Sequence, residues 1–238
     1  MWNELNESDV EEWVKEAAAR GDPGPVTWNV LNRYARLVEY LDKEKDERIG
    51  LTLFVWHANG MHKELETYEP ALRRLVTLCD ASQGPVRIDE VWSFDAADTG
   101  DAAIVNAGKM EDYADWVDDA RDLLSFIDNY LPSNFAQSNL PIYLPRMDSA
   151  IIERRKLKGV EERSLVRIGH SFGGRVLANA ACRRPNIFRS LTLIDPVLFR
   201  DWAKEQTFYI LGALCRRAHW ASREEAKELL RKRPVFMS

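Results

Sequence analysis

The sequence Leu-Val-Arg-Ile-Gly-His-Ser-Phe-Gly-Gly at residues 165–174 is an apolar run that ends in a Gly-x-Ser-x-Gly pentapeptide. Residues 164–168 have the composition of a short strand, and residues 175–182 are mostly helix formers. A strand that turns sharply into a helix holds the serine side chain clear of the backbone, and the helix N-terminus stabilises an oxyanion beside it. The pattern predicts a nucleophile elbow at Ser171. The alternative is a glycine-rich strand-to-helix turn with no catalytic role.

Composition and charge restrict the class of protein. The 238 residues are 45% hydrophobic and 30% charged, which suits one sizeable globular core. The formal net charge is −5 and no basic stripe is visible, so we expect no nucleic-acid partner. We expect neither a metal nor an organic cofactor, because no ligand cluster is visible. The three cysteines lack metal-ligand spacing and are expected to be reduced thiols: Cys79, Cys182 and Cys215.

Neither end of the sequence resembles a targeting signal. Residues 1–20 are acidic and lack the apolar segment of a signal peptide, and no run has membrane-spanning length. The final residues, Val-Phe-Met-Ser, differ from a peroxisomal signal of the Ser-Lys-Leu type. A cytoplasmic location is therefore the expectation.

Apolar runs alternate with helical patterns along the chain. We expect strands at residues 51–56, 86–94, 164–168 and 190–194. Helices are expected at residues 8–21, 68–78, 112–130, 175–182, 202–217 and 222–232. Capping boxes, in which a serine and a glutamate three residues later satisfy helical N–H groups, open two of these helices at Ser8 and Ser222. Alternating strands and helices predict an α/β fold with a doubly wound sheet.

Two segments have a less regular pattern. Residues 26–42 fit either a helix or a strand, and residues 156–163 read as a charged, solvated connector. The chain is expected to divide into an N-terminal helix and linker at 1–25, an α/β core at 26–198 and a helical segment at 199–238.

Ordered blocks across residues 50–235 resemble one family. They match the α/β-hydrolase superfamily of the AB hydrolase-1 type. More narrowly, they resemble fungal serine hydrolases related to acyl-CoA hydrolases of the mycophenolic pathway and to host-toxin biosynthesis proteins. The likeness rests on the blocks His57–Glu64, Val91–Ala96, Gly100–Ala103, Trp116–Pro132, Gly169–Gly174 and Leu191–Pro196.

The resemblance implies a serine esterase or thioesterase that acts on a small-molecule ester or thioester, such as acyl-CoA or a secondary-metabolite ester. Ser171 would form the acyl-enzyme, and the backbone N–H groups of Asn59 and Phe172 would form the oxyanion hole. Asp195 would be the triad acid, because this subgroup is similar to those that place it after the sixth strand. The alternative is that Asp195 merely ends a strand.

The triad also needs a base, because a serine hydroxyl is a poor nucleophile until a histidine takes its proton. The family's histidine follows the last strand, beyond a helical cap. His57 and His62 lie in the oxyanion loop and His170 precedes the serine; His219 lies between two expected cap helices and would reach the site only if the cap folds over it. None of the four matches the family's position, so His219 is a candidate only.

The resemblance therefore implies a partial α/β-hydrolase fold. Its sheet would be mostly parallel, residues 199–238 would begin the helical cap, and the last strands would be absent. The 191–194 strand would then be an exposed edge that invites a partner. We expect an incomplete, truncated hydrolase, and a non-catalytic binding remnant is the alternative function. A full-length relative could be peroxisomal.

Overall fold

The computed structural model describes residues 27–36, 47–63, 68–82, 84–110, 116–133, 140–198 and 219–232. The chain divides into two compact units, Met1–Val197 and Leu198–Ser238. The helices predicted at 8–21 and 202–217 lie outside the described residues. The predicted boundaries of the three segments stay a prediction.

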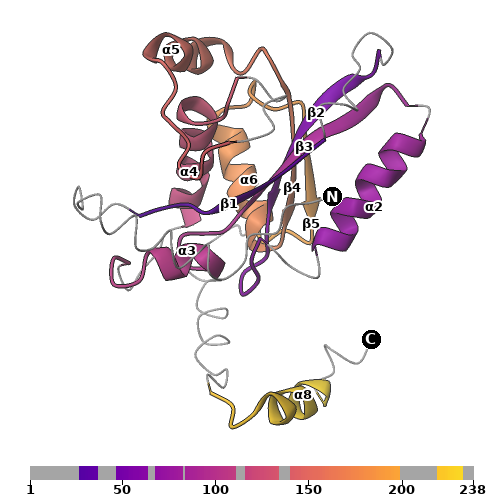
Figure 1. The fold of residues 1–238 in the computed structure, drawn as a ribbon, viewed down its shortest axis with the longest axis vertical. Helices are drawn as coiled ribbons and strands as arrows, with labels where there is room; N and C mark the ends of the chain where they lie inside the picture. Colours follow the sequence, from indigo (N-terminus) through magenta and orange to yellow (C-terminus); the bar gives the residue numbers. More distant parts are fainter. Residues whose placement is uncertain are drawn as a thin grey trace. The chain divides into compact units, whose positions relative to one another are not determined.

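The described part of the first unit is built on a five-stranded sheet in the order β1-β3-β2-β4-β5 (Figure 1). Four neighbouring strands are parallel, and β1 pairs antiparallel with β3 at one edge. This arrangement confirms the α/β fold class. The strands are β1 (Leu31–Ala35), β2 (Ile49–Trp56), β3 (Val86–Phe94), β4 (Ser164–His170) and β5 (Ser190–Ile194).

Helices cover both faces of the sheet (Figure 1). On β2, Phe54 and Trp56 belong to the hydrophobic cluster that includes helices α4 and α6, whereas Leu53 and Val55 pack with α2. Alternate residues of a strand point to opposite faces, so both faces of β2 are buried, as its continuous apolar run predicts. The helices are α2 (Tyr68–Ala81), α3 (Gly100–Val105), α4 (Trp116–Asn129), α5 (Ser149–Lys158), α6 (Phe172–Arg183) and α8 (Arg223–Arg231).

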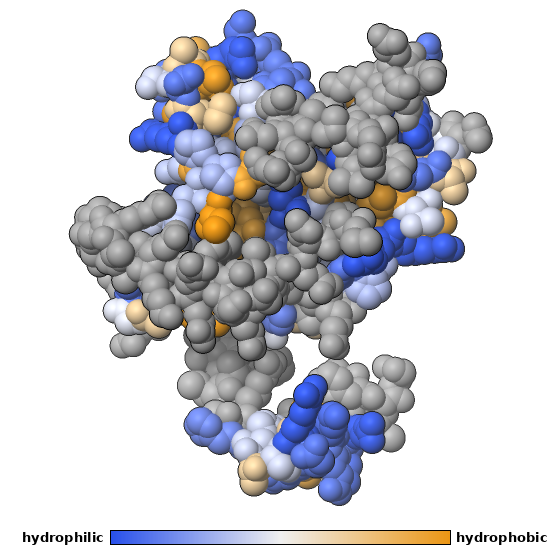
Figure 2. Space-filling view, in the orientation of Figure 1, coloured by the Kyte–Doolittle hydropathy of each residue, from blue (hydrophilic) through white to orange (hydrophobic). Residues whose placement is uncertain are grey.

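Several predicted elements are confirmed. The ambiguous 26–42 segment contains a strand at residues 31–35, and residues 37–46 lie outside the described ranges. In the second unit, the predicted capping box opens α8. The Ser222 hydroxyl accepts from Glu225 N at 3.1 Å, and Glu225 Oε2 accepts from Ala221 N at 2.8 Å. The visible face of α8 is mostly hydrophilic (Figure 2).

The solvated connector predicted at residues 156–163 is confirmed only in part, because residues 156–158 and Glu161 are exposed whereas Arg163 is buried. Its first residues end helix α5, and the Arg163 side chain is buried against Glu90. The neighbouring Arg155 is fully buried and donates to the carbonyls of Ile127 and Leu131, at 3.0 and 2.7 Å. These carbonyls lie at the C-terminal end of α4, where backbone acceptors lack helical partners. Arg155 and Arg163 therefore bind polar groups of the interior, whereas Lys156 and Lys158 stay exposed.

Candidate active site

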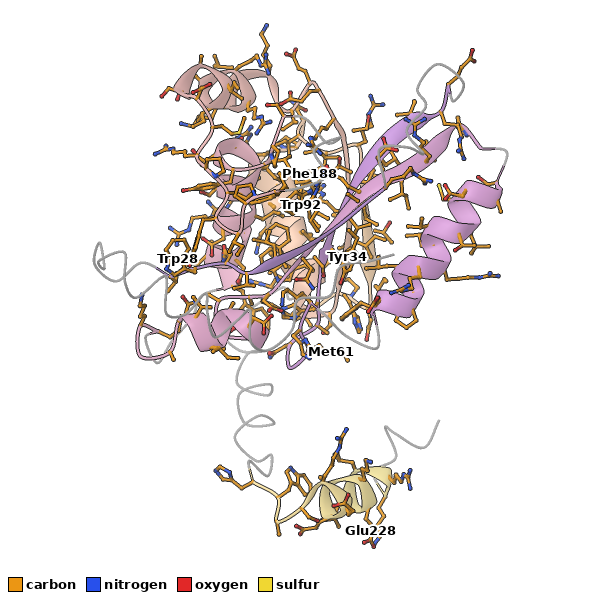
Figure 3. The ribbon with its side chains drawn as sticks, viewed as in Figure 1. Trp28, Tyr34, Met61, Trp92, Phe188 and Glu228 are labelled. Carbon is orange, nitrogen blue, oxygen red and sulfur yellow. The ribbon has the colours of Figure 1, made fainter. Side chains whose placement is uncertain are left out.

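The four parallel strands end at the same level of the sheet. Trp56 pairs with Phe94 on one side and with Gly169 on the other, and His170 pairs with Ile194. The loops that follow these strands therefore gather at one edge, where α/β proteins bind their ligands. Figure 3 shows Met61 in the loop that leaves β2 at this edge.

Ser171 is the single residue between β4 and α6, and its backbone has φ 51° and ψ −114°. A positive φ is unfavourable for a residue with a side chain and persists only where surrounding contacts impose it. Here the Ser171 N–H donates to the Ile194 carbonyl at 2.9 Å, and its own carbonyl accepts from Val197 N at 3.0 Å. The chain thus turns sharply at Ser171. Its role as a nucleophile stays a prediction.

The glycines of the pentapeptide allow backbones to approach closely. A Cβ atom at Gly169 would lie 2.6 Å from the carbonyl oxygen of Gly173. One at Gly173 would lie 2.3 Å from the carbonyl oxygen of Trp56. Gly173 N also donates to the His57 carbonyl at 3.1 Å. The start of α6 therefore packs directly against the point where the loop leaves β2.

The loop after β2 forms a tight turn. Met61 N donates to the Ala58 carbonyl at 3.0 Å, and Gly60 at the third position has φ 77°, as a type II turn requires. The Ala58 N–H donates to the Tyr68 hydroxyl at 2.9 Å. Asn59 is exposed, and its N–H lies outside the hydrogen bond that closes the turn. Phe172 begins α6, so its N–H has no acceptor within that helix.

His57 is buried and serves as a structural link. Its Nδ1 donates to the Ala58 carbonyl at 2.8 Å, and its Nε2 accepts from Ala96 N at 3.1 Å and lies 3.2 Å from the Thr99 hydroxyl. Burial lowers the pKa of His57 below its ordinary value of 6.5, which favours this neutral form. Both ring nitrogens are engaged, so the imidazole joins the loops after β2 and β3.

An ion-pair cluster fixes the same two loops. The buried Lys63 ammonium pairs with Asp95 at 3.3 Å and with Asp101 at shorter range. The Asp95 carboxylate also accepts from Lys63 N at 2.7 Å and from Asp101 N at 3.1 Å. The residue pattern did not predict Lys63, Tyr68 or Thr99 as parts of the site. The one available signal was Asp95, an acidic residue directly after an apolar strand.

Asp195 lies beside the serine turn. Its backbone has φ 43°, and its neighbours Ile194 and Val197 hydrogen-bond the Ser171 backbone. Its carboxylate is exposed and makes no hydrogen bond with the described residues. Its role as triad acid stays a prediction.

Among the described residues of the first unit, no histidine hydrogen-bonds the Ser171 hydroxyl. His170 Nδ1 lies 2.8 Å from the Tyr68 hydroxyl, and His62 is exposed. His219 is exposed and belongs to the second unit. The structure thus brings together Asn59, Ser171, Phe172 and Asp195 through backbone contacts of their segments, and no histidine from the described residues of the first unit joins them as a base.

The described residues contain neither a metal-binding group nor a membrane-spanning helix. No group of three or more His, Cys, Asp or Glu residues could hold a metal ion in the part of the chain that the structure describes. In the same ranges, no helix is both long and apolar enough to span a bilayer.

Comparison with known proteins gives several relatives. The chain is 30% identical over 182 residues to the type I acyl-CoA thioesterase mpaH of Penicillium brevicompactum. The aligned region covers 74% of this chain and 34% of that protein. It is 31% identical over 148 residues to the peroxisomal membrane protein LPX1 of Saccharomyces cerevisiae, covering 62% of this chain and 31% of that protein. No protein-family model matches.

The fold is shared with solved structures of other proteins. The peroxisomal α/β-hydrolase Lpx1 of Saccharomyces cerevisiae superposes with a TM-score of 0.59 at 25% identity, over 87% of this chain and 50% of that one. The match to the curated relatives spans about a third of their length, at 34% for the Penicillium brevicompactum thioesterase.

Proposed function

Because the chain is related to the α/β-hydrolase superfamily, we propose that it is a serine hydrolase that cleaves an ester or thioester through an acyl-enzyme on Ser171. The observation that carries the proposal is the Ser171 backbone, held at φ 51° between a parallel strand and the start of a helix. A serine in this position projects its hydroxyl at the edge where ligands bind. An acyl-CoA substrate is proposed because the relatives include acyl-CoA thioesterases.

In the proposed first step, Ser171 Oγ attacks the acyl carbonyl and loses its proton to a base. The N–H groups of Asn59 and Phe172 stabilise the oxyanion of the tetrahedral intermediate. Collapse of this intermediate expels the alcohol or thiol, which takes up the proton from the base. A water molecule then attacks the acyl-enzyme by the same route, releasing the acid and restoring Ser171.

Asp195 is the proposed acid that orients the base. Its neighbours on both sides are bound to the Ser171 backbone, which keeps the carboxylate in the segment beside the nucleophile. Among the four histidines, His57 has partners at both ring nitrogens and His170 is bound to Tyr68. His219 is the candidate base of this chain.

A fluorophosphonate probe tests the nucleophile, because it reacts with activated serines. We expect labelling of the wild-type chain and none of Ser171→Ala. Ser164→Ala, at the start of the same strand, is the matched control and should label normally. Hydrolysis of acyl-CoA of graded chain length then tests the substrate class.

The alternative is a binding protein that retains the site without turnover. It is favoured because, among the described residues of the first unit, no histidine hydrogen-bonds the Ser171 hydroxyl. A folded wild-type chain that takes no label, yet binds acyl-CoA, would establish this alternative. Loss of labelling in His219→Gln would instead identify the base.

A further inference from the structure

We propose that the Tyr68 hydroxyl is a positioning group that holds the loop carrying Asn59 at a fixed place relative to the Ser171 turn. This inference rests on the proposed function and adds a residue to it. The partners of the Tyr68 hydroxyl are Ala58, Met61 and His170, and Ser171 is not among them. It acts through the backbone of the two segments that it joins.

The Tyr68 hydroxyl contacts three groups from two distant parts of the chain. It accepts from Ala58 N at 2.9 Å, lies 2.8 Å from His170 Nδ1, and lies 3.4 Å from the sulfur of Met61. A phenol hydroxyl both donates and accepts, so it can bridge an N–H group and a ring nitrogen at once. One oxygen therefore links the loop after β2 to the end of β4.

Two of these contacts lie one residue from a proposed site residue. Ala58 immediately precedes Asn59, and His170 immediately precedes Ser171. The contact to Ala58 also occupies the N–H group next to that of Asn59, whose own N–H lies outside the hydrogen bond that closes the turn. A shift of the turn would move this donor away from the oxyanion.

The surroundings of Tyr68 suit a rigid link. Tyr68 is the first residue of α2, and its ring packs edge-on against the His170 ring with centroids 6.0 Å apart. Burial raises the pKa of Tyr68, so the hydroxyl stays protonated across the neutral range. On the opposite side, Gly173 N donates to the His57 carbonyl at 3.1 Å. The loop is thus held at both His57 and Ala58.

Replacement of Tyr68 by phenylalanine tests the link, because it removes only the hydroxyl. The matched control is Tyr34→Phe, whose half-buried hydroxyl lies 3.5 Å from Asn32 Nδ2. Tyr34 lies on the sheet, apart from the loop that carries Met61 (Figure 3). Two measurements are made on the full chain: amide hydrogen exchange at residues 58–61, and the rate of fluorophosphonate labelling as a function of probe concentration.

In Tyr68→Phe we expect exchange at residues 58–61 to accelerate by about tenfold, while β2 stays protected. The limiting labelling rate should fall by about tenfold, because small displacements of an oxyanion donor reduce reactivity. The half-saturating probe concentration should stay within about twofold, since binding is not affected. Tyr34→Phe should match the wild type in all three values.

Unchanged exchange in Tyr68→Phe would overturn the link itself. Faster exchange with an unchanged limiting rate would overturn its role in the reaction and leave the proposed function intact. A wild-type chain that takes no label would overturn the proposed function, and with it the proposed effect of Tyr68 on the labelling rate.

Discussion

The sheet contains two buried charge clusters that bind different kinds of partner. Near the middle of β3, Glu90 is bound by the side chains of Arg33, Thr52 and Arg163. At the carboxyl edge, Asp95 accepts from the backbone N–H groups of Lys63 and Asp101. A carboxylate bound by side chains stabilises the packing of strands, whereas one bound by backbone N–H groups fixes the course of loops. Substitutions in the Glu90 cluster should therefore lower the free energy of unfolding, whereas substitutions in the Asp95 cluster should also lower the reactivity of Ser171.

The largest expected effect is that of Glu90→Gln. The amide keeps one acceptor but presents N–H groups where arginine donors lie, so two buried guanidinium groups lose an ionic partner. Breaking a buried ion pair costs about 3–5 kcal/mol. Urea unfolding should show this loss in the free energy of unfolding, while the folded fraction labels at Ser171 within about twofold of the wild-type rate.

A large drop in labelling by folded Glu90→Gln would break the comparison, because it would show that the central cluster also governs the site.

Asp95→Asn should have the second-largest effect on the free energy of unfolding. The amide would face the Asp101 N–H and the Lys63 ammonium with its own donor, but Lys63 keeps its pair with Asp101. We expect a loss of about 2–3 kcal/mol in the free energy of unfolding, somewhat less than for Glu90. The loops after β2 and β3 should loosen, so labelling at Ser171 should fall about tenfold at a temperature where the variant is folded.

Equal labelling rates in folded Asp95→Asn and the wild type would contradict the role assigned to this cluster. Asp80→Asn is a suitable control, because Asp80 also pairs with an arginine, Arg36, but at an exposed position. Such surface pairs contribute under about 1 kcal/mol, and this variant should label normally.

The smallest effect is the pH dependence that His57 contributes. Burial lowers its pKa in the folded state below 6.5, so the unfolded state binds more protons below that pH. The contribution of His57 to stability should therefore be fully present well above pH 6.5 and be lost as the pH falls below 6.5, by at most about 1 kcal/mol between pH 6.5 and 5.5. Urea unfolding of wild type and His57→Gln at each pH measures this, because other groups cancel in the difference.

An identical pH slope in wild type and His57→Gln would show that His57 does not titrate differently in the folded and unfolded states. The neutral form of His57 would then contribute nothing to the pH dependence of stability.

Four of the five strands could be predicted because each is an apolar run bounded by turn residues, whereas β1 lies in a segment that fits either a helix or a strand. The runs at 51–56, 86–94 and 190–194 match β2, β3 and β5 closely. Helix α5 was missed, because its sequence is rich in charge and has no clear apolar stripe. Arg155 is buried there because it finds carbonyls from another helix, and a sequence pattern contains no information on that distant partner.

The same limit applies to the candidate site. The sharp turn at Ser171 follows from its flanking glycines, which are local in sequence. Tyr68 and Lys63 act through partners that other loops supply, so their roles depend on tertiary contacts. The position of Asp195 beside the serine turn was implied by a family resemblance, and the backbone contacts now give that position a physical basis without testing its chemistry.

The strand order has a consequence for access to this edge. From β2 the chain passes through α2 to β3 on one side, whereas from β4 it passes through α6 to β5 on the other. Crossovers of the same right hand that progress in opposite directions place their helices on opposite faces of the sheet, as α2 and α6 are. The loops after β2 and β4 therefore diverge between adjacent strands. Such a topological switch point is where open α/β sheets bind their ligands, and Ser171 directly follows one of its two strands.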